Sequence, residues 1–165
     1  MTVGSPVVQR DRGFRHPVDV RFFEVDSLGV VFNMWYLGWC DEAMSAYLEH
    51  LGHGYRTLRE SGHDAVLRRA ELDWVDSLQA FESAQVRVRV EHIGSTSFRL
   101  GYDIERTSPR EPDGQSCAHV SITYVCVSVA DRAKAPIPLG LRTALEQDRS
   151  GQGVDPAVPA RPTCG

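Results

Sequence analysis

Lysine is almost absent from this sequence of 165 residues. Lys134 is the one lysine among eighteen basic residues, so the other seventeen are arginines, and the acidic residues bring the formal net charge to −4. The arginines are interspersed with Asp and Glu, and no basic stripe with aromatic residues appears. Nucleic-acid binding proteins show the opposite pattern. We therefore expect no nucleic-acid partner.

Long apolar segments are missing as well. No run approaches the ~20 apolar residues that a membrane-spanning helix needs. The N-terminal residues also lack the basic and apolar regions of a secretory signal. From these features we expect a cytoplasmic protein without a membrane partner.

Neither cysteine nor histidine occurs in a pattern that binds metal. The cysteines lack CxxC spacing and nearby histidine ligands, which argues for reduced thiols: Cys40, Cys117, Cys126 and Cys164. Three histidines follow one another in a glycine-containing stretch without a matching set of carboxylates, and we interpret them as solvated loop residues: His50, His53 and His63. We expect no metal and no cofactor.

Length and hydrophobic content indicate a single domain with a core of its own, since 42% of the residues are hydrophobic. Both ends are rich in residues that do not form regular structure, such as Gly and Pro. We predict an N-terminal tail at residues 1–15, a domain at 16–148 and a C-terminal tail at 149–165.

The apolar periodicity predicts one strand, then one long helix. Val18, Val20 and Phe22 alternate with polar neighbours, which is typical of a half-buried strand. From Met34 to about Leu51 the period changes to that of a helix, whose polar residues fall within one stripe of ~100°. The rest of this helix is apolar, so we expect it to be wrapped on several sides.

The remainder of the chain reads as strands followed by one short helix. A short helical turn is expected at Tyr55 to Glu60, and a strand broken by two arginines at residues 65–75. Three further strands and a final helix complete the prediction: Gln85 to Ile93, Phe98 to Arg106, Cys117 to Val129 and Leu139 to Gln147.

These elements indicate an α+β fold. A curved antiparallel sheet of about five strands, wrapped around one long central helix, explains why that helix is apolar on most of its surface. Such a small sheet leaves an edge uncovered. We therefore expect pairing with a second copy, as a homodimer or homotetramer.

The segment Arg21 to Tyr47 carries the chemistry. Asp26 lies in a glycine-containing turn just before the long helix, and Asn33 is predicted to cap the helix N-terminus. A carboxylate can attack a carbonyl or activate water, and unpaired N–H groups at a helix start can hold the developing oxyanion. By itself, Asp26 is equally typical of a turn residue that bonds its own backbone.

This segment resembles the hotdog-fold thioesterases of the 4-hydroxybenzoyl-CoA and Tol-Pal-associated acyl-CoA thioesterase type. The resemblance lies in Arg21, Glu24-Val25-Asp26, Gly29-Val30-Val31-Phe32-Asn33, Tyr36-Leu37, Trp39 and Asp41-Glu42-Ala43, and weakly in the later strands to about residue 130. It implies a single hotdog domain and hydrolysis of a small-molecule acyl thioester. It also implies that Asp26 is the catalytic carboxylate, as nucleophile or general base.

The resemblance assigns roles to further residues. The backbone N–H at Asn33 is the expected oxyanion donor. Near it, substrate contacts are expected from Gly29, Val30, Phe32 and Tyr36, with Asp41 at the distal end of the acyl group. The nucleotide part of a CoA ligand is expected at the turn between the third and fourth strands, through Ser95, Thr96 and Ser97.

Several alternatives stay open. Asp41 also suits a solvated helix face, and Glu24 could raise the pKa of Asp26 through like charge. The turn at Ser95 lacks the basic cluster of the hydroxybenzoyl enzymes, so the thioester could be carried by CoA or by an acyl carrier protein. Two other functions stay open. The protein could be a dehydratase or hydratase, or a non-catalytic protein that binds an acyl ligand beside Trp35, Tyr36 and Trp39.

Overall fold

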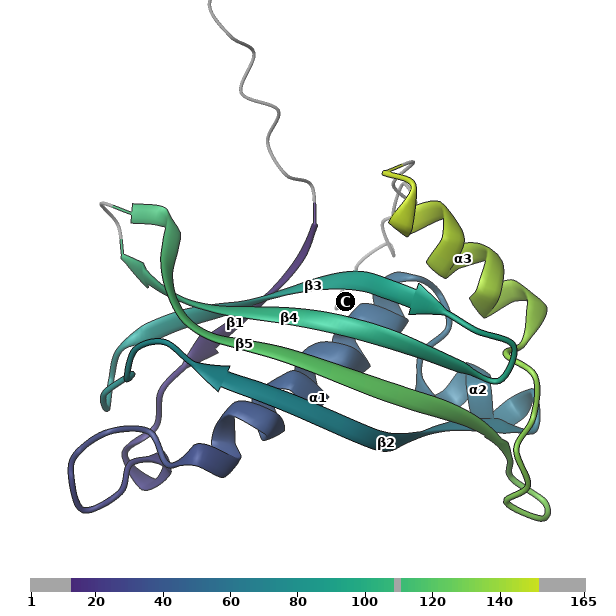
Figure 1. The fold of residues 1–165 in the computed structure, drawn as a ribbon, viewed down its shortest axis with the longest axis horizontal. Helices are drawn as coiled ribbons and strands as arrows, with labels where there is room; N and C mark the ends of the chain where they lie inside the picture. Colours follow the sequence, from purple (N-terminus) through teal and green to yellow (C-terminus); the bar gives the residue numbers. More distant parts are fainter. Residues whose placement is uncertain (1–12, 109–110, 152–165) are drawn as a thin grey trace, which may run out of the picture.

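The fold is one curved antiparallel sheet with a long helix across one face. The computed structural model describes residues 13–108 and 111–151. Five strands pair in the order β1-β3-β4-β5-β2, with these bounds: β1 (Phe14–Asp19), β2 (His63–Trp74), β3 (Ser83–Ile93), β4 (Ser97–Ser108) and β5 (Glu111–Ser128). Helix α1 (Asn33–His50) lies in the hollow of the sheet (Figure 1). The predicted fold class is confirmed.

The first strand begins and ends earlier than its alternation predicted. β1 starts at Phe14, inside the tail expected at residues 1–15, and the chain from Phe22 to Glu24 forms a short 3-10 helix, η1, instead of continuing the strand. The carboxylate of Glu24 accepts the Arg21 N–H at 2.7 Å, which stabilises this tight turn and takes the chain out of the sheet. Residues 1–12 and 152–165 of the predicted tails lie outside the described residues.

Helix α1 follows its predicted pattern. Its acidic stripe is exposed, and its opposite face is buried through six residues: Tyr36, Trp39, Cys40, Ala43, Tyr47 and Leu48. The predicted N-cap is wrong, because Asn33 is the first helical residue and Phe32 precedes it without any side-chain cap. The helix is held by tertiary packing, which dominates helix stability in proteins.

The later strands match the prediction except at their irregular points. The predicted break at the paired arginines is a β-bulge between Leu67 and Arg69, so β2 runs through it as one strand. β5 begins at Glu111, which pairs with Ser108, so most of the connecting loop expected at residues 108–114 is strand. Bulges and longer pairing arise from the partner strand, which local periodicity does not report.

Two short helices cover the end of the sheet opposite to the start of α1. α2 (Tyr55–Glu60) follows α1, and α3 (Leu139–Arg149) packs beside β3 through Leu141, Ala144 and Leu145. The Tyr47 hydroxyl donates to Asp148 Oδ2 at 2.7 Å, which ties α3 to α1. No helix within residues 13–108 and 111–151 has both the length and the apolar character needed to cross a membrane.

Candidate active site

The Asp26 turn is closed by its own backbone. The Asp26 N–H donates to Val30 O at 2.8 Å, and the Gly29 N–H donates to Asp26 O at 3.0 Å. Gly29 has a φ of +77°, a left-handed conformation that a residue with a Cβ rarely adopts. Asp26 Oδ1 accepts the Leu28 N–H at 2.8 Å. This contact fixes the carboxylate at the mouth of the turn, where it is partly exposed.

A buried glutamate connects this turn to the helix. Glu24 is 2% exposed, and its carboxylate accepts hydrogen bonds from the Arg21 N–H and from the Trp39 indole, the latter at 3.2 Å. Its backbone oxygen accepts the Phe32 N–H at 2.9 Å. A buried carboxyl group that accepts several hydrogen bonds is a structural clamp. Glu24 therefore points into the core and does not face Asp26.

The start of α1 presents free N–H donors beside the turn. The Trp35 N–H donates to Phe32 O at 3.0 Å, whereas the backbone N–H groups of Asn33 and Met34 have no acceptor among the described residues. Val25 and Val31 pair as an isolated bridge, which brings the acid and the helix start to one site. The Asn33 side chain is exposed and takes no part in capping. The donors and the acid thus share one short loop.

The other predicted contacts around the turn divide into core and surface. Val30 bridges to Gln79, and Phe32 is 46% exposed beside the helix start. Tyr36 is 2% exposed, and its hydroxyl accepts the Leu78 N–H at 3.4 Å. Its ring contacts Trp39 and Trp74. Within one subunit, Tyr36 therefore belongs to the core and not to an open substrate pocket.

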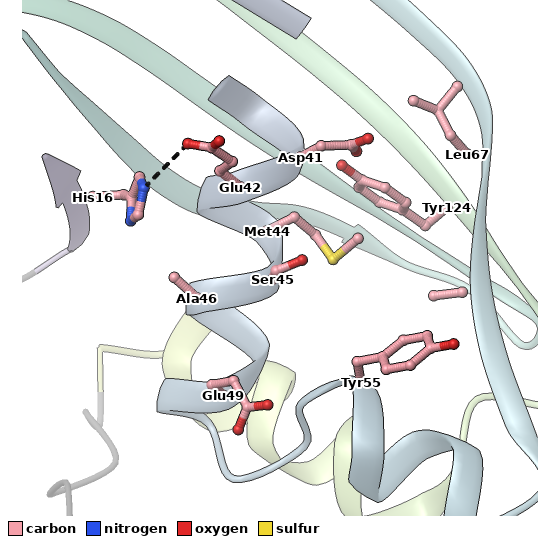
Figure 2. Close-up of a pocket in the computed structure, with 11 residues that line it drawn as sticks. His16, Asp41, Glu42, Met44, Ser45, Ala46, Glu49, Tyr55, Leu67 and Tyr124 are labelled. Atoms are coloured by element: carbon pink, nitrogen blue, oxygen red, sulfur yellow. Dashed lines mark ion pairs between the residues drawn. The ribbon is translucent and has the colours of Figure 1, made fainter. Parts of the chain in front are cut away.

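Asp41 lines a pocket further along α1. This pocket of about 670 Å³ lies between α1, the first residues of α2 and the inner face of β2 and β5 (Figure 2). Asp41, Glu42 and Glu49 give it acidic walls, while Met44, Leu67 and Tyr124 give it apolar ones. Burial raises the pKa of the Asp41 carboxyl from its ordinary value. Asp41 is thus part of a pocket and not only of a solvated helix face.

The predicted nucleotide turn has an arginine beside it that sequence reasoning missed. Arg142 of α3 donates through Nη2 to Gly94 O and, at 3.3 Å, to Ser95 O. The Ile137 N–H also donates to Ser95 O, at 3.0 Å, and the Cys126 N–H donates to Thr96 O. The sequence separation of 47 residues between Arg142 and Ser95 left no local signal for this contact.

Within one subunit the two halves of the predicted site lie apart. The Asp26 turn is at the N-terminal end of α1, and the turn at Ser95 to Ser97 is at the other end of the sheet, next to α3 (Figure 1). α1, which begins beside the Asp26 turn and runs toward the other end of the sheet, has 18 residues and is therefore about 27 Å long at 1.5 Å per residue. A single chain therefore does not bring Asp26 and Ser95 together.

The three histidines from the end of α1 onward have separate surroundings. The His50 ring is tilted against Phe14, with ring centroids 5.2 Å apart, and His63 Nδ1 contacts Ser61. His53 is partly buried under Gly140, and this burial lowers its pKa. His53 lies in the loop between α1 and α2, as predicted, but it is half-buried beside α3 and not fully solvated.

Comparison with known proteins identifies the family. The family model described as the Thioesterase-like superfamily matches residues 20–145, so the chain belongs to that superfamily. A 1,4-dihydroxy-2-naphthoyl-CoA hydrolase from Synechococcus sp. (strain RCC307) is 24% identical, over 77% of this chain and 96% of the relative.

Two solved structures show the same fold. A 1,4-dihydroxy-2-naphthoyl-CoA thioesterase from Synechocystis has a TM-score of 0.71 and 22% identity, over 80% of this chain and 94% of its own. The Dynemicin thioesterase, described with polyene binding, has a TM-score of 0.71 and 23% identity, over 82% of this chain and 96% of its own.

Proposed function

We propose that this protein hydrolyses an acyl-CoA thioester to a carboxylic acid and a free thiol. The observation that carries the proposal is that Asp26 and the free N–H groups at the start of α1 belong to one short loop, which the Val25–Val31 bridge closes. Membership of the Thioesterase-like superfamily and relatives named as acyl-CoA hydrolases support the same reaction.

In this proposal the Asn33 N–H receives the thioester oxygen. Negative charge grows on that oxygen as the carbonyl carbon becomes tetrahedral, and one such donor contributes about 3 kcal/mol to the transition state. Asp26 either attacks the carbon and forms a mixed anhydride, or removes a proton from the attacking water. In both routes the thiolate leaves and takes up a proton. In the first route water then hydrolyses the anhydride, which releases the carboxylic acid and restores Asp26.

The proposed active site is completed by a second copy. β2 is an edge strand of twelve residues with exposed apolar side chains, including Val66, Leu67 and Trp74. The other edge, β1, has six residues and contains Pro17, which suits an unpaired edge. Antiparallel pairing of two β2 strands would set the Trp74 end, with Asp26, against the partner's His63 end.

The nucleotide of CoA would then bind at the partner's turn. The partner's Ser95, Thr96 and Ser97 would offer hydroxyl and backbone donors, and the partner's Arg142 would offer a guanidinium that binds phosphate well. Arg142 would favour CoA as the carrier if phosphate replaced Glu146, which now lies 3.5 Å from Arg142 Nη1. An acyl carrier protein is the alternative carrier.

The acyl group would enter the pocket beside Asp41. Its apolar walls suit an aromatic or aliphatic group, and its three carboxylates disfavour an acyl group that is itself negatively charged. Assignment to the 4-hydroxybenzoyl-CoA and Tol-Pal-associated type is part of this proposal, as is a homodimer or homotetramer. A cytoplasmic location stays a prediction from the sequence.

The test is Asp26→Asn, assayed on a panel of aryl- and alkyl-CoA and acyl-carrier thioesters. The asparagine oxygen can still accept the Leu28 N–H, so the turn is preserved while the charge is lost. We expect hydrolysis to fall by at least about 100-fold. Asp131→Asn is the matched control, because Asp131 accepts the Ala133 N–H in a similar turn.

Two results would overturn the proposal. If the Asp26→Asn variant still hydrolyses a verified substrate, Asp26 has no part in the mechanism. If the wild-type protein binds acyl groups tightly but releases thiol from no substrate in the panel, the protein is a non-catalytic binding protein.

A further inference from the structure

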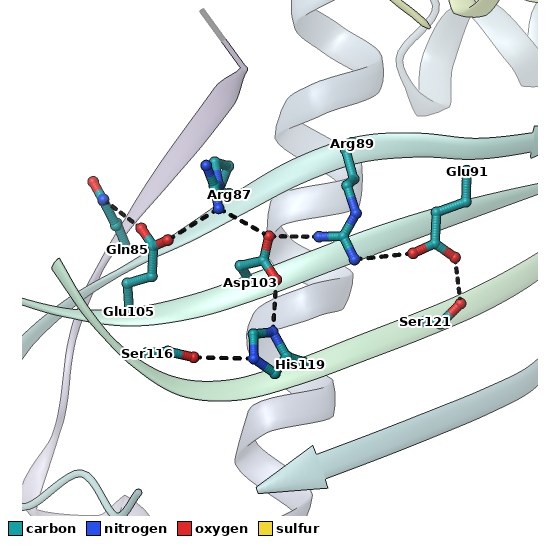
Figure 3. Close-up of polar contacts among 9 residues, drawn as sticks. All are labelled: Gln85, Arg87, Arg89, Glu91, Asp103, Glu105, Ser116, His119 and Ser121. Carbon is teal, nitrogen blue, oxygen red and sulfur yellow. Dashed lines mark hydrogen bonds and ion pairs between the residues drawn. The ribbon is translucent and has the colours of Figure 1, made fainter. Parts of the chain in front are cut away.

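A second set of reactive side chains lies on the outer face of the sheet, away from α1. Ser116 Oγ is 3.2 Å from His119 Nε2, and His119 Nδ1 is 2.7 Å from Asp103 Oδ1 (Figure 3). A carboxylate can only accept, so in the neutral imidazole this contact places the proton on Nδ1 and leaves Nε2 to accept from the serine hydroxyl. This is the order of contacts that a nucleophile, its base and the residue that orients the base require.

A β-bulge produces this arrangement. Residues three apart on a regular strand point to opposite faces, so Ser116 and His119 of β5 would ordinarily be separated by the sheet. The pairing shifts between Ile104↔Ala118 and Glu105↔Ser116, and Cys117 is the extra residue. Cys117 and Ala118 are both 0% exposed, which leaves Ser116 on the outer face with His119. Bulges that redirect a side chain are over-represented next to active sites.

Asp103 is held so that it stays ionised. It is 8% exposed, and its Oδ2 is bound by Arg89 and, at 3.2 Å, by Arg87 from β3, which leaves Oδ1 for the histidine. Burial alone would raise the pKa of Asp103, but the His119 and Arg89 hydrogen bonds and the nearby guanidinium charges lower it overall. The carboxylate can therefore fix the orientation of His119 and stabilise its protonated form.

A cavity adjoins the proposed base. The His119 side chain is 50% exposed, and this cavity of about 400 Å³ is lined by His119, Arg87, Arg89 and Asp103, whereas Ser116 contacts His119 from outside the lining. Each guanidinium is already matched by carboxylates, Arg87 by Glu105 at 3.3 Å and Arg89 by Glu91 at 3.0 Å. Such charge-balanced walls suit an uncharged ligand better than the phosphates of CoA.

We propose that Ser116, His119 and Asp103 form a second acyl-transfer centre that cleaves small uncharged carboxylic esters. Ser116 Oγ attacks the ester carbonyl carbon while His119 Nε2 takes the hydroxyl proton. The C–O bond to the alcohol breaks, and His119 returns the proton to the leaving alkoxide. Water then cleaves the acyl-serine by the same route, which releases the carboxylic acid and restores the serine.

The test uses the full chain carrying Asp26→Asn, so that the thioesterase site does not contribute. A fluorophosphonate probe should label Ser116, identified by peptide mass spectrometry, and p-nitrophenyl acetate should be hydrolysed. Adding His119→Gln should slow labelling by roughly 100-fold, the lower range for loss of a general base. Ser116→Ala should remove the label.

Ser121→Ala is the matched control. Ser121 lies on the same strand and face, but its hydroxyl donates to Glu91 at 2.6 Å and not to a histidine. Labelling should persist in this variant. The proposal fails if Ser116 stays unlabelled, if Ser121 is labelled equally, or if His119→Gln leaves the labelling rate unchanged in a protein whose unfolding midpoint is that of the wild type.

Discussion

Trp39 Nε1 donates a 3.2 Å hydrogen bond to Glu24 Oε1, and both side chains are at most 3% exposed. The glutamate lies in η1 and the tryptophan in α1, so the bond joins the turn that carries Asp26 to the helix that offers the N–H donors. The relative position of acid and donors therefore depends on a residue that is buried in the core.

We expect Glu24→Gln to destabilise the protein by about 1–3 kcal/mol, because one amide NH₂ group would face the Arg21 N–H or the Trp39 indole, donor against donor. Urea unfolding measures the loss, and kcat should fall with it. Glu60→Gln is the control, since Glu60 is exposed in α2. If the two variants are equally stable, the hydrogen bonds of Glu24 do not stabilise the protein as proposed.

Asn33→Pro should lower kcat by about 100- to 1,000-fold, because it removes the proposed oxyanion donor. Proline is tolerated at the first position of a helix, and Phe32 already has the extended conformation, ψ 138°, that a following proline requires. Asn33→Ala keeps the N–H and should retain most of the activity. Loss of kcat in the alanine variant would point to the side chain.

Mixing two inactive variants should restore activity if the site spans two subunits. Asp26→Asn removes the acid, and Ser95→Glu places a negative charge where the phosphates are expected to bind. A heterodimer would contain one site with both wild-type halves, so an equal, exchanged mixture should recover about a quarter of wild-type activity. No recovery, with subunit exchange verified by mass spectrometry, would contradict the composite site.

Asp41→Asn should improve the hydrolysis of negatively charged acyl groups. One unit charge at about 4 Å in a watery environment is equivalent to about 1 kcal/mol, so kcat/KM for a succinyl thioester should rise about fivefold. An uncharged benzoyl thioester is the internal control and should change little. If kcat/KM changes equally for both substrates, the pocket does not discriminate acyl groups by their charge.

Acid should weaken the outer face of the sheet through Asp103. Its pKa is lower in the folded protein than its ordinary value, so its contribution is present above the unfolded pKa and is lost as the pH falls through the folded pKa. The unfolding free energy of the wild type should therefore fall more steeply below about pH 4 than that of Asp103→Asn. If the unfolding free energies of the two proteins change in parallel with pH, Asp103 is not the group responsible.

Local sequence patterns were sufficient for most elements and failed where a distant residue intervened. The alternation at Val86, Val88 and Val90 predicted β3 nearly to its ends, because burial follows that period as far as the bulge after Val90. The same alternation at Val18 to Phe22 was misleading, because Glu24 turns the chain into η1. Asn33 suited a cap by type, but the helix start is fixed by the bond from Phe32 to Glu24.

The sequence by itself determined the order of the elements, the apolar faces of the strands and α1, and the position of Asp26 in a turn just before that helix. These features depend on neighbours within a few residues. Only the tertiary structure decided the contacts between Glu24 and Trp39, between Arg142 and Ser95, and among Ser116, His119 and Asp103. These contacts depend on the strand register, on the bulge at Cys117 and on the packing of α3 against the sheet. All three arise only when the sheet closes over its core.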